Sequence, residues 1–105
     1  MAAKIVWLSE AVGDLEEIVH FIDSRSDSYS SIVAARLLEA AESLAELPNR
    51  GALIREDVTE RHRHLICYSY RIIYRVESDY VFIVGVIHGA RLLPDDVLQR
   101  GPTRA

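Results

Sequence analysis

The stretch from residue 70 to 91 constrains the fold of this chain more than any other part of the sequence. Its two runs, residues 70–76 and 80–87, are rich in β-branched and aromatic residues and flank a polar turn at residues 77–79. This composition predicts two antiparallel strands joined by a short turn. Residues 88–91, with the sequence His-Gly-Ala-Arg, end the second strand in a polar corner.

The second of these strands is apolar on both faces. Strict alternation places Tyr80, Phe82, Val84 and Val86 on one face and Val81, Ile83 and Ile87 on the other. A strand that is covered on one side only alternates apolar with polar residues, and this strand does not. We therefore expect both faces to be covered, by the chain's own helical hairpin together with a separate partner chain.

Two amphipathic helices are predicted in the first half of the chain. Residues 3–8 form a short apolar strand, and Ser9 stands where the N-cap of a following helix is expected. Apolar residues recur at helical spacing as far as Ile22 and, after a polar turn at residues 23–28, again over residues 33–47. Two antiparallel helices with a short connection form a hairpin.

The remaining segments complete a single domain of 105 residues. A Pro-Gly break at residues 48–51 and a loop over residues 52–60 lead to a strand over residues 61–68. A C-terminal tail, from about residue 94 to 105, contains one helical turn. The order β-α-α-β-β-β predicts an α+β fold in which the helical hairpin packs on a mostly antiparallel sheet.

Composition excludes several classes of protein. No apolar run approaches the ~18 residues of a membrane span, and the N-terminus lacks the apolar core of a secretory signal. Cys67 is the single cysteine, which excludes an internal disulfide and fits a reducing cytoplasm. No Cys/His cluster has zinc-ligand spacing, and no motif indicates a cofactor.

The charge is unevenly distributed along the chain. The net charge is -4, but residues 1–49 hold nine acids and three bases, whereas residues 50–105 hold seven acids and nine bases, all arginine. Arginine suits bidentate and stacked contacts. The acidic total argues against a protein whose main task is to grip a nucleic-acid backbone.

Arginines and tyrosines interleave along the predicted sheet. The residues are Arg61, Arg63, Arg71, Arg75, Arg91, Tyr68, Tyr70, Tyr74 and Tyr80. Such a mixture fits a protein–protein interface, a solvated sheet face or a nucleic-acid site. With an acidic total charge, we favour the protein interface.

Three histidines and two carboxylates are further candidates for chemistry. His62, His64 and His88 titrate near neutrality and are possible general acids or bases, but no nucleophile stands beside them in a known motif, so structural or surface roles are favoured. Asp14 and Glu17 share one face of the first helix, which suits either a metal pair or, as we favour, a solvated face.

Four segments together resemble the ParE/RelE toxin superfamily, and its ParE-like branch in particular. They are residues 7–18, the Pro-Gly break at residues 47–51, the strand at residues 70–76 and the His-Gly-Ala-Arg ending at residues 86–91. In order, they cover about residues 4–93, nearly the whole chain.

The resemblance implies the toxin of a type II toxin–antitoxin pair, with a role in plasmid stabilisation or stress response. ParE-like toxins are non-enzymatic inhibitors of DNA gyrase and are neutralised by a ParD-like antitoxin. RelE-like relatives are instead ribosome-dependent endoribonucleases that cut messenger RNA, using basic residues on the sheet and a tyrosine near the C-terminus.

Carried over by position, the ribonuclease set is incomplete in this chain. Arg71 and Arg91 match the arginines of the RelE branch, but His62 and His64 stand where its lysine pair is expected. Val97 stands near the position of the tyrosine. This departure favours the gyrase inhibitor and keeps the ribonuclease, with Arg71, Arg91, His62 and His64, as the alternative.

The expected partner is the antitoxin, bound in a hetero-oligomer, with gyrase as the target. The residues expected to make partner contacts are Arg71, Tyr74, Arg75, Tyr80, Phe82, His88 and Arg91. We expect no sequence-specific binding of nucleic acid and no contact with a membrane.

Overall fold

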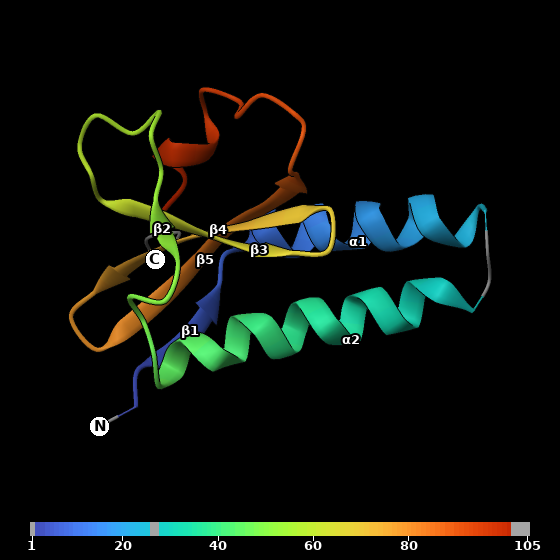
Figure 1. Ribbon diagram of the computed structural model, residues 1–105, viewed down its shortest axis with the longest axis horizontal. Helices are drawn as coiled ribbons and strands as arrows, with labels where there is room; N and C mark the ends of the chain where they lie inside the picture. The colour runs from blue at the N-terminus through green and yellow to red at the C-terminus, as the bar shows by residue number, and fades with distance from the viewer. Residues whose placement is uncertain (1, 26–27, 102–105) are drawn as a thin grey trace.

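The computed structural model describes residues 2–25 and 28–101 and shows a five-stranded sheet with two helices on one of its faces (Figure 1). Across the sheet the strands lie in the order β1 (Lys4–Trp7), β5 (Tyr80–His88), β4 (Tyr70–Glu77), β3 (His62–Cys67) and β2 (Ala52–Leu53). β1 runs parallel to β5, and the other neighbouring pairs are antiparallel. The predicted α+β fold is confirmed, and the short β2 lies inside the segment predicted as a loop.

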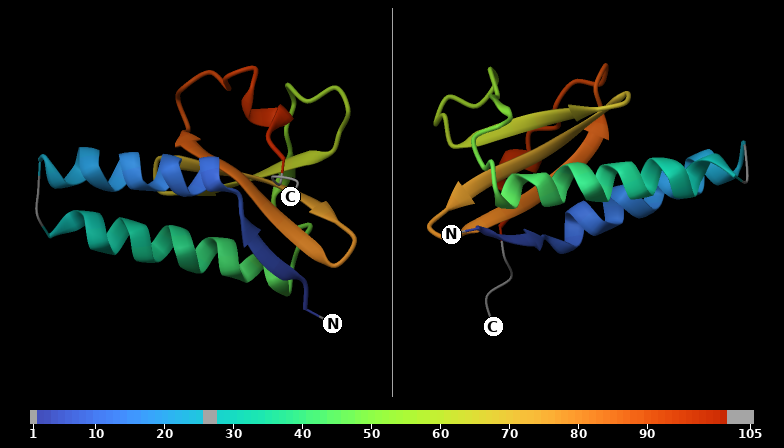
Figure 2. Two further views of the ribbon diagram at one scale, coloured as in Figure 1. Left: turned by 180° about the vertical axis from the view of Figure 1, so that it is seen from behind. Right: turned by 60° about the horizontal axis from the view of Figure 1, so that its bottom comes forward.

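The helical hairpin lies against one face of the sheet and extends past its end (Figure 2). Its elements are α1 (Ser9–Asp23), α2 (Tyr29–Glu42) and the 3₁₀ turn η1 (Ser43–Ala45). Ser9 does not cap α1 as predicted, because Leu8 occupies the N-cap position. The N–H of Leu8 donates to the carbonyl of Ile83 at 3.0 Å, which keeps Leu8 in line with β1. The second helix is shorter than predicted, since Leu47 lies beyond η1 and is 61% exposed.

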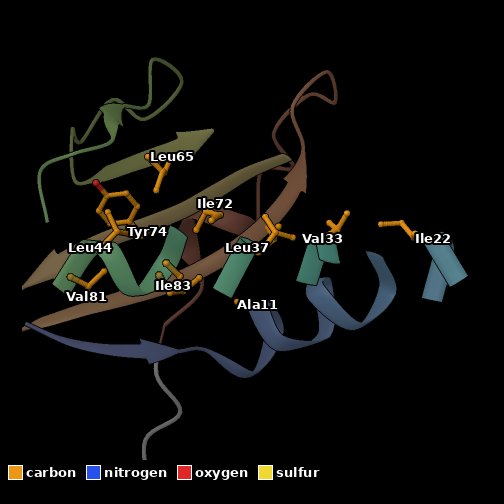
Figure 3. Packing of buried hydrophobic residues seen from close by; sticks show 12 residues of the cluster. Ala11, Ile22, Val33, Leu37, Leu44, Leu65, Ile72, Tyr74, Val81 and Ile83 are labelled. Carbon is orange, nitrogen blue, oxygen red and sulfur yellow. The ribbon is translucent and has the colours of Figure 1, made fainter. Parts of the chain in front are cut away.

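The main core lies between the helices and the sheet (Figure 3). Its fully buried residues come from both layers and include Ala11, Val33, Leu37, Ala41, Leu44, Ile72, Tyr74, Val81 and Ile83. The small side chains of Ala11 and Ala41 let the backbones of the helices approach this layer closely. Replacing a buried leucine such as Leu37 by alanine would cost ~2–5 kcal/mol.

The opposite face of the sheet carries a second apolar cluster. It contains Leu8, Ile54, Ile73, Val84, Ile87 and Val97, with Phe82, Leu93 and Leu98 packed against them. Val97 belongs to the 3₁₀ turn η2 (Val97–Gln99) and is only 1% exposed. The chain's own C-terminal segment, residues 93–101, therefore covers this face, and the expectation that a separate chain is needed there is wrong. Residues 102–105 of the expected tail lie outside the described residues.

A register shift between β4 and β5 changes which residues of β5 face the core. The shift lies between Ile73 and Tyr74 and leaves Val84 without a partner residue in β4. An extra residue of this kind is a β-bulge, and it reverses the alternation of side chains beyond it. Val86 therefore packs in the main core and Ile87 in the second cluster, the reverse of the faces predicted by strict alternation.

Candidate functional site

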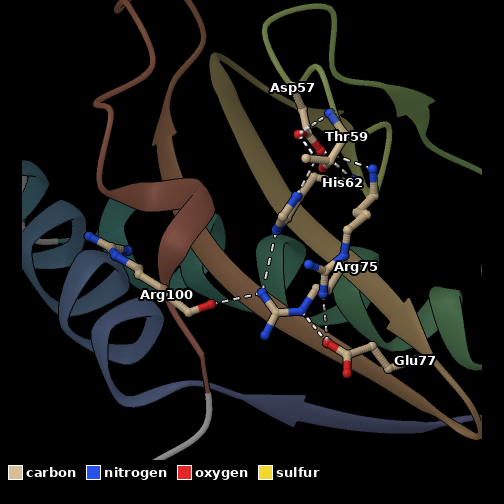
Figure 4. Close-up of polar contacts among 7 residues, drawn as sticks. Asp57, Thr59, His62, Arg75, Glu77 and Arg100 are labelled. Carbon is tan, nitrogen blue, oxygen red and sulfur yellow. Dashed lines mark hydrogen bonds and ion pairs between the residues drawn. The ribbon is translucent and has the colours of Figure 1, made fainter.

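A network of buried polar side chains lies on the second face of the sheet and begins at Asp57 (Figure 4). The Asp57 carboxylate accepts hydrogen bonds from the backbone N–H groups of Arg61 at 3.0 Å and His62 at 2.9 Å. Thr59 donates to its other oxygen through its hydroxyl at 2.6 Å and its N–H at 3.1 Å. Burial by itself raises the pKa of Asp57, but the hydrogen bonds from Thr59 and His62 outweigh burial and hold the pKa well below its ordinary value. The ionised carboxylate fixes the loop formed by residues 54–61.

His62 links this carboxylate to Arg75. Because an ionised carboxylate only accepts hydrogen bonds, Nδ1 of His62 donates to Asp57, at 2.9 Å. The other ring nitrogen, Nε2, faces Nη1 of Arg75 at 3.4 Å. Both nitrogens are thus engaged inside the protein, and the residue is 3% exposed. His62 acts as a structural link between the 54–61 loop and β4.

The guanidinium of Arg75 is also used internally. Its Nε donates to the Glu77 carboxylate, and its Nη1 donates to the backbone carbonyl of Arg100 at 2.7 Å. The hydrogen bond from Arg75 is the main cause of a lowered pKa at Glu77. Arg75 is 6% exposed and lies 5.7 Å from the centroid of the Phe82 ring. A residue expected to contact a partner instead joins β4 to the C-terminal segment.

Arg71 and His64 lie on the same face of neighbouring strands, and each has unused hydrogen-bonding capacity. Nη1 of Arg71 lies 3.9 Å from the Glu56 carboxylate. Its Nε and Nη2, together with Nδ1 of His64, are buried and have no hydrogen-bond partner among the described residues. Burial first, and then the charge of Arg71, lower the pKa of His64, while Glu56 opposes this shift. An unsatisfied guanidinium edge beside a neutral imidazole is suited to an incoming carboxylate or phosphate oxygen.

A second polar link lies at the edge of β5 beyond the end of β1. Nη1 of Arg100 donates to the Asp14 carboxylate at 2.7 Å and to the carbonyl of Val84 at 3.0 Å. The same Asp14 oxygen accepts the N–H of Val86 at 3.1 Å. Gly85 makes the approach possible, because a Cβ there would lie 3.0 Å from Nη1 of Arg100 and 3.1 Å from the Asp14 carboxylate. Asp14, considered above as half of a metal pair, instead anchors the C-terminal segment to α1.

The corner after β5 opens onto a groove along α1. The groove has a volume of 590 Å³ and is lined in part by Phe21, Tyr70, His88 and Arg91. The ring of His88 packs edge-on against Tyr70, with 5.8 Å between ring centroids, and its Nδ1 accepts the N–H of Ala90 at 3.2 Å. His88 and Arg91 are both exposed. The corner predicted to be polar is thus exposed to solvent.

The remaining aromatic candidates occupy different environments. Tyr74 is fully buried; its hydroxyl donates to the carbonyl of Pro48 at 2.7 Å and accepts the N–H of Gly51 at 2.8 Å. Burial raises the pKa of Tyr74, so the hydroxyl stays protonated and keeps both hydrogen bonds. Tyr80 is 41% exposed and stacks on Phe82, with 5.7 Å between ring centroids.

The structure does not gather the predicted contact residues into one patch. His88, Arg91 and Tyr80 are exposed, whereas Tyr74 and Arg75 are buried and internally bonded. Three of the four residues of the ribonuclease alternative share one face of the sheet. Arg91 lines the groove along α1, while Arg71, His62 and His64 lie on the second face of the sheet.

Asp57, Asp14 and Arg100 position the site, and none of the three was predicted from the sequence to do so. Asp57 carried one local signal, since an aspartate followed two residues later by threonine is typical of a turn closed by the aspartate side chain. Asp14 and Arg100 are 86 residues apart, and no local pattern relates them.

A family profile described as the ParE toxin of the type II toxin–antitoxin system, parDE, matches residues 5–93. The chain belongs to the ParE toxin family. This ParE-family toxin is 38% identical over 90 residues to Toxin RelE2 of Caulobacter vibrioides, a match that covers 86% of this chain and 99% of that protein. The toxin is thus a type II toxin of the ParE/RelE superfamily, as the sequence resemblance indicated.

Solved structures share the fold of this ParE-family toxin. The chromosomal ParDE system of P. aeruginosa gives a TM-score of 0.72 at 18% identity, covering 83% of this chain and 96% of that one. RelBE2 of Mycobacterium tuberculosis gives 0.64 at 22% identity, covering 87% and 95%. A mutant of E. coli RelE in the free state gives 0.64 at 17% identity, covering 94% and 93%. Both ParE-type and RelE-type proteins therefore share this architecture.

Two further observations concern residues 2–25 and 28–101 of the toxin. No helix there is long and apolar enough to cross a membrane. No three side chains of the metal-ligating types are arranged there to hold a metal ion.

Proposed function

We propose that this toxin inhibits DNA gyrase through a protein–protein contact in the cytoplasm and that a ParD-like antitoxin holds it inactive. The observation that carries this proposal is the state of His62, whose ring is held between Asp57 and Arg75. Ribonuclease chemistry requires groups that converge on a developing phosphate charge. His62 is engaged by Asp57 and Arg75 and is not free to contact a phosphate, which favours an inhibitor that acts by binding.

The antitoxin is proposed to bind as part of a hetero-oligomer, in keeping with a role in plasmid stabilisation or stress response. The related P. aeruginosa and M. tuberculosis structures are described as toxin–antitoxin systems, which supports a partner of this kind. The unused Nε and Nη2 of Arg71 are suited to a carboxylate from an acidic antitoxin segment. Displacement of the half-exposed Glu56 side chain, which lies 3.9 Å from Nη1 of Arg71, would give that carboxylate access while the 54–61 loop stays in place.

A ribosome-dependent ribonuclease is the second candidate, and one observation favours it. Arg71 and His64 present three buried nitrogens that have no partner within residues 2–25 and 28–101, and a phosphate would satisfy them as well as a carboxylate. In that reading Arg71 would hold the phosphate and His64, whose pKa is lowered, would act as a base near neutral pH.

Paired assays separate the two functions. Purified toxin is added to supercoiling and DNA-cleavage reactions of gyrase and, in parallel, to ribosomes programmed with a defined message. We expect trapped gyrase–DNA cleavage complexes and intact message. An Arg71→Met variant should keep the effect on gyrase while binding the antitoxin ~1–3 kcal/mol more weakly in titration calorimetry. Message cutting that disappears in Arg71→Met and His64→Ala, with gyrase unaffected, would replace the inhibitor by the ribonuclease.

A further inference from the structure

Two apolar side chains stand almost completely in solvent on the side of the sheet away from the helices. Val58 is 93% exposed and Leu92 is 88% exposed, the two largest values among the large apolar side chains of the described residues. Their segments, the 54–61 loop and the start of the C-terminal segment, rise from the same side of the sheet (Figure 1). Between these segments lies a cleft of 710 Å³ lined by Val58, by Leu93 next to Leu92, and by His62.

Hydrogen bonds and apolar packing fix the conformation of both segments. The Asp57 carboxylate accepts five hydrogen bonds within the 54–61 loop, from Thr59, Arg61 and His62. On the other side of the cleft, Leu93 packs into the second apolar cluster, and Arg100 bonds to Asp14. An apolar side chain on a preorganised support loses little conformational freedom on binding, which favours a role as an anchor.

The charge of this surface decides which class of partner it suits. Leaving out the buried Asp57, the segments 55–61 and 92–96 together contain four acids and two bases, a net charge of -2. The cations near the cleft floor are already neutralised, Arg75 by Glu77 and Arg100 by Asp14. A nucleic-acid backbone would be repelled here, whereas an apolar protein surface with a basic rim would be complementary in shape and charge.

We propose that Val58 and Leu92, together called the anchor, bind this toxin to its protein target. Both side chains insert into apolar pockets that basic side chains surround. The inference rests on the proposed function in one respect, that the target is a protein. The antitoxin carboxylate is assigned to Arg71, so anchor and antitoxin contact are separable by mutation.

The test uses Val58→Ser, Leu92→Ser and the double variant in the full chain. Leu47→Ser is the matched control, because Leu47 is also exposed, at 61%, but follows the helical hairpin and lies outside both segments. Three properties are measured: growth arrest on induction without antitoxin, affinity for purified gyrase, and affinity for the antitoxin by titration calorimetry. Melting temperatures establish that each variant is folded.

Each single anchor variant should bind gyrase about tenfold more weakly, and the double variant should lose growth arrest. Antitoxin affinity and melting temperature should match those of the parent and of Leu47→Ser. Asp95→Lys, on the cleft wall, should slow association with gyrase most strongly at low salt.

The outcomes separate failure of the anchor from failure of the proposed target. Full growth arrest by the double variant overturns the anchor whatever the target is. Loss of antitoxin affinity with arrest intact also overturns it, since the surface then belongs to the antitoxin. If the parent does not bind gyrase but the double variant still loses arrest, the anchor stands and gyrase is the wrong target.

Discussion

Asp57 illustrates how much a single carboxylate contributes to this molecule. It is 7% exposed, and it accepts the hydrogen bonds that close the 54–61 loop and orient His62. We expect Asp57→Asn to lower the free energy of unfolding at pH 7 by ~1.5–3 kcal/mol, because hydrogen bonds to a charged group are replaced by weaker ones and the amide NH₂ faces other donors. Urea unfolding measures this difference.

The pKa of Asp57 gives that prediction a pH dependence. The pKa is depressed in the folded protein, so its contribution to stability is fully present above the unfolded value of about 3.9 and is lost as the pH falls below it. The stability difference between parent and Asp57→Asn should therefore shrink from pH 7 to pH 3. Glu16→Gln, on the exposed side of α1, is the control and should show little difference at either pH. A gap that stays constant over this range would mean that Asp57 is not ionised in the folded protein.

For single residues, the sequence indicated which side chains make important polar contacts better than it indicated the partners of those contacts. Tyr74, Arg75 and His62 were selected because they combine charge, aromaticity and hydrogen-bonding capacity, and the structure uses those capacities inside the protein. Alternation along β4 places Arg75 on the face opposite Tyr74. What alternation cannot give is whether another segment later folds over that face, as the C-terminal segment does here.

Among the elements, the strands and helices were predictable because their signals are local, whereas the link between α1 and the C-terminal segment was not. That link also satisfies two backbone groups of β5, the carbonyl of Val84 and the N–H of Val86, at an edge that β1 no longer covers. The bulge at Val84 likewise depends on pairing with β4, which no pattern within β5 reveals.

Arg100→Met should therefore loosen the C-terminal segment while leaving the helices and the sheet folded. It keeps the length of the side chain but removes the hydrogen bonds to Asp14 and Val84, at a cost of ~1–3 kcal/mol. Hydrogen exchange followed by mass spectrometry should show faster exchange in residues 93–101 and unchanged protection in β4. Arg36→Met, an exposed substitution on α2, should change neither region. Equal protection of residues 93–101 in parent and Arg100→Met would contradict the role assigned to the contacts of Arg100 with Asp14 and Val84.

For the whole molecule, the C-terminal segment replaces the partner chain that the doubly apolar β5 led us to expect. We predict that the full chain is a monomer in solution by light scattering and that a chain ending at Leu92 self-associates. The truncation uncovers Ile73, Val84 and Ile87, and a contiguous apolar patch of this kind favours association. A truncated chain that remains monomeric with the melting temperature of the full chain would show that the segment adds nothing to the fold.

The parallel pairing of β1 with β5 has a consequence for the time at which the fold is completed. It places Lys4 beside Tyr80, so residues near the two ends of the chain must meet before the sheet is complete. Contacts of such sequence separation form late, and a nascent chain leaves the ribosome from its N-terminus. The cleft beside Val58 is lined in part by Arg100, so it is also incomplete until Arg100 reaches Asp14. A growing chain therefore cannot complete this sheet or the cleft beside it until residues 80–100 have left the ribosome.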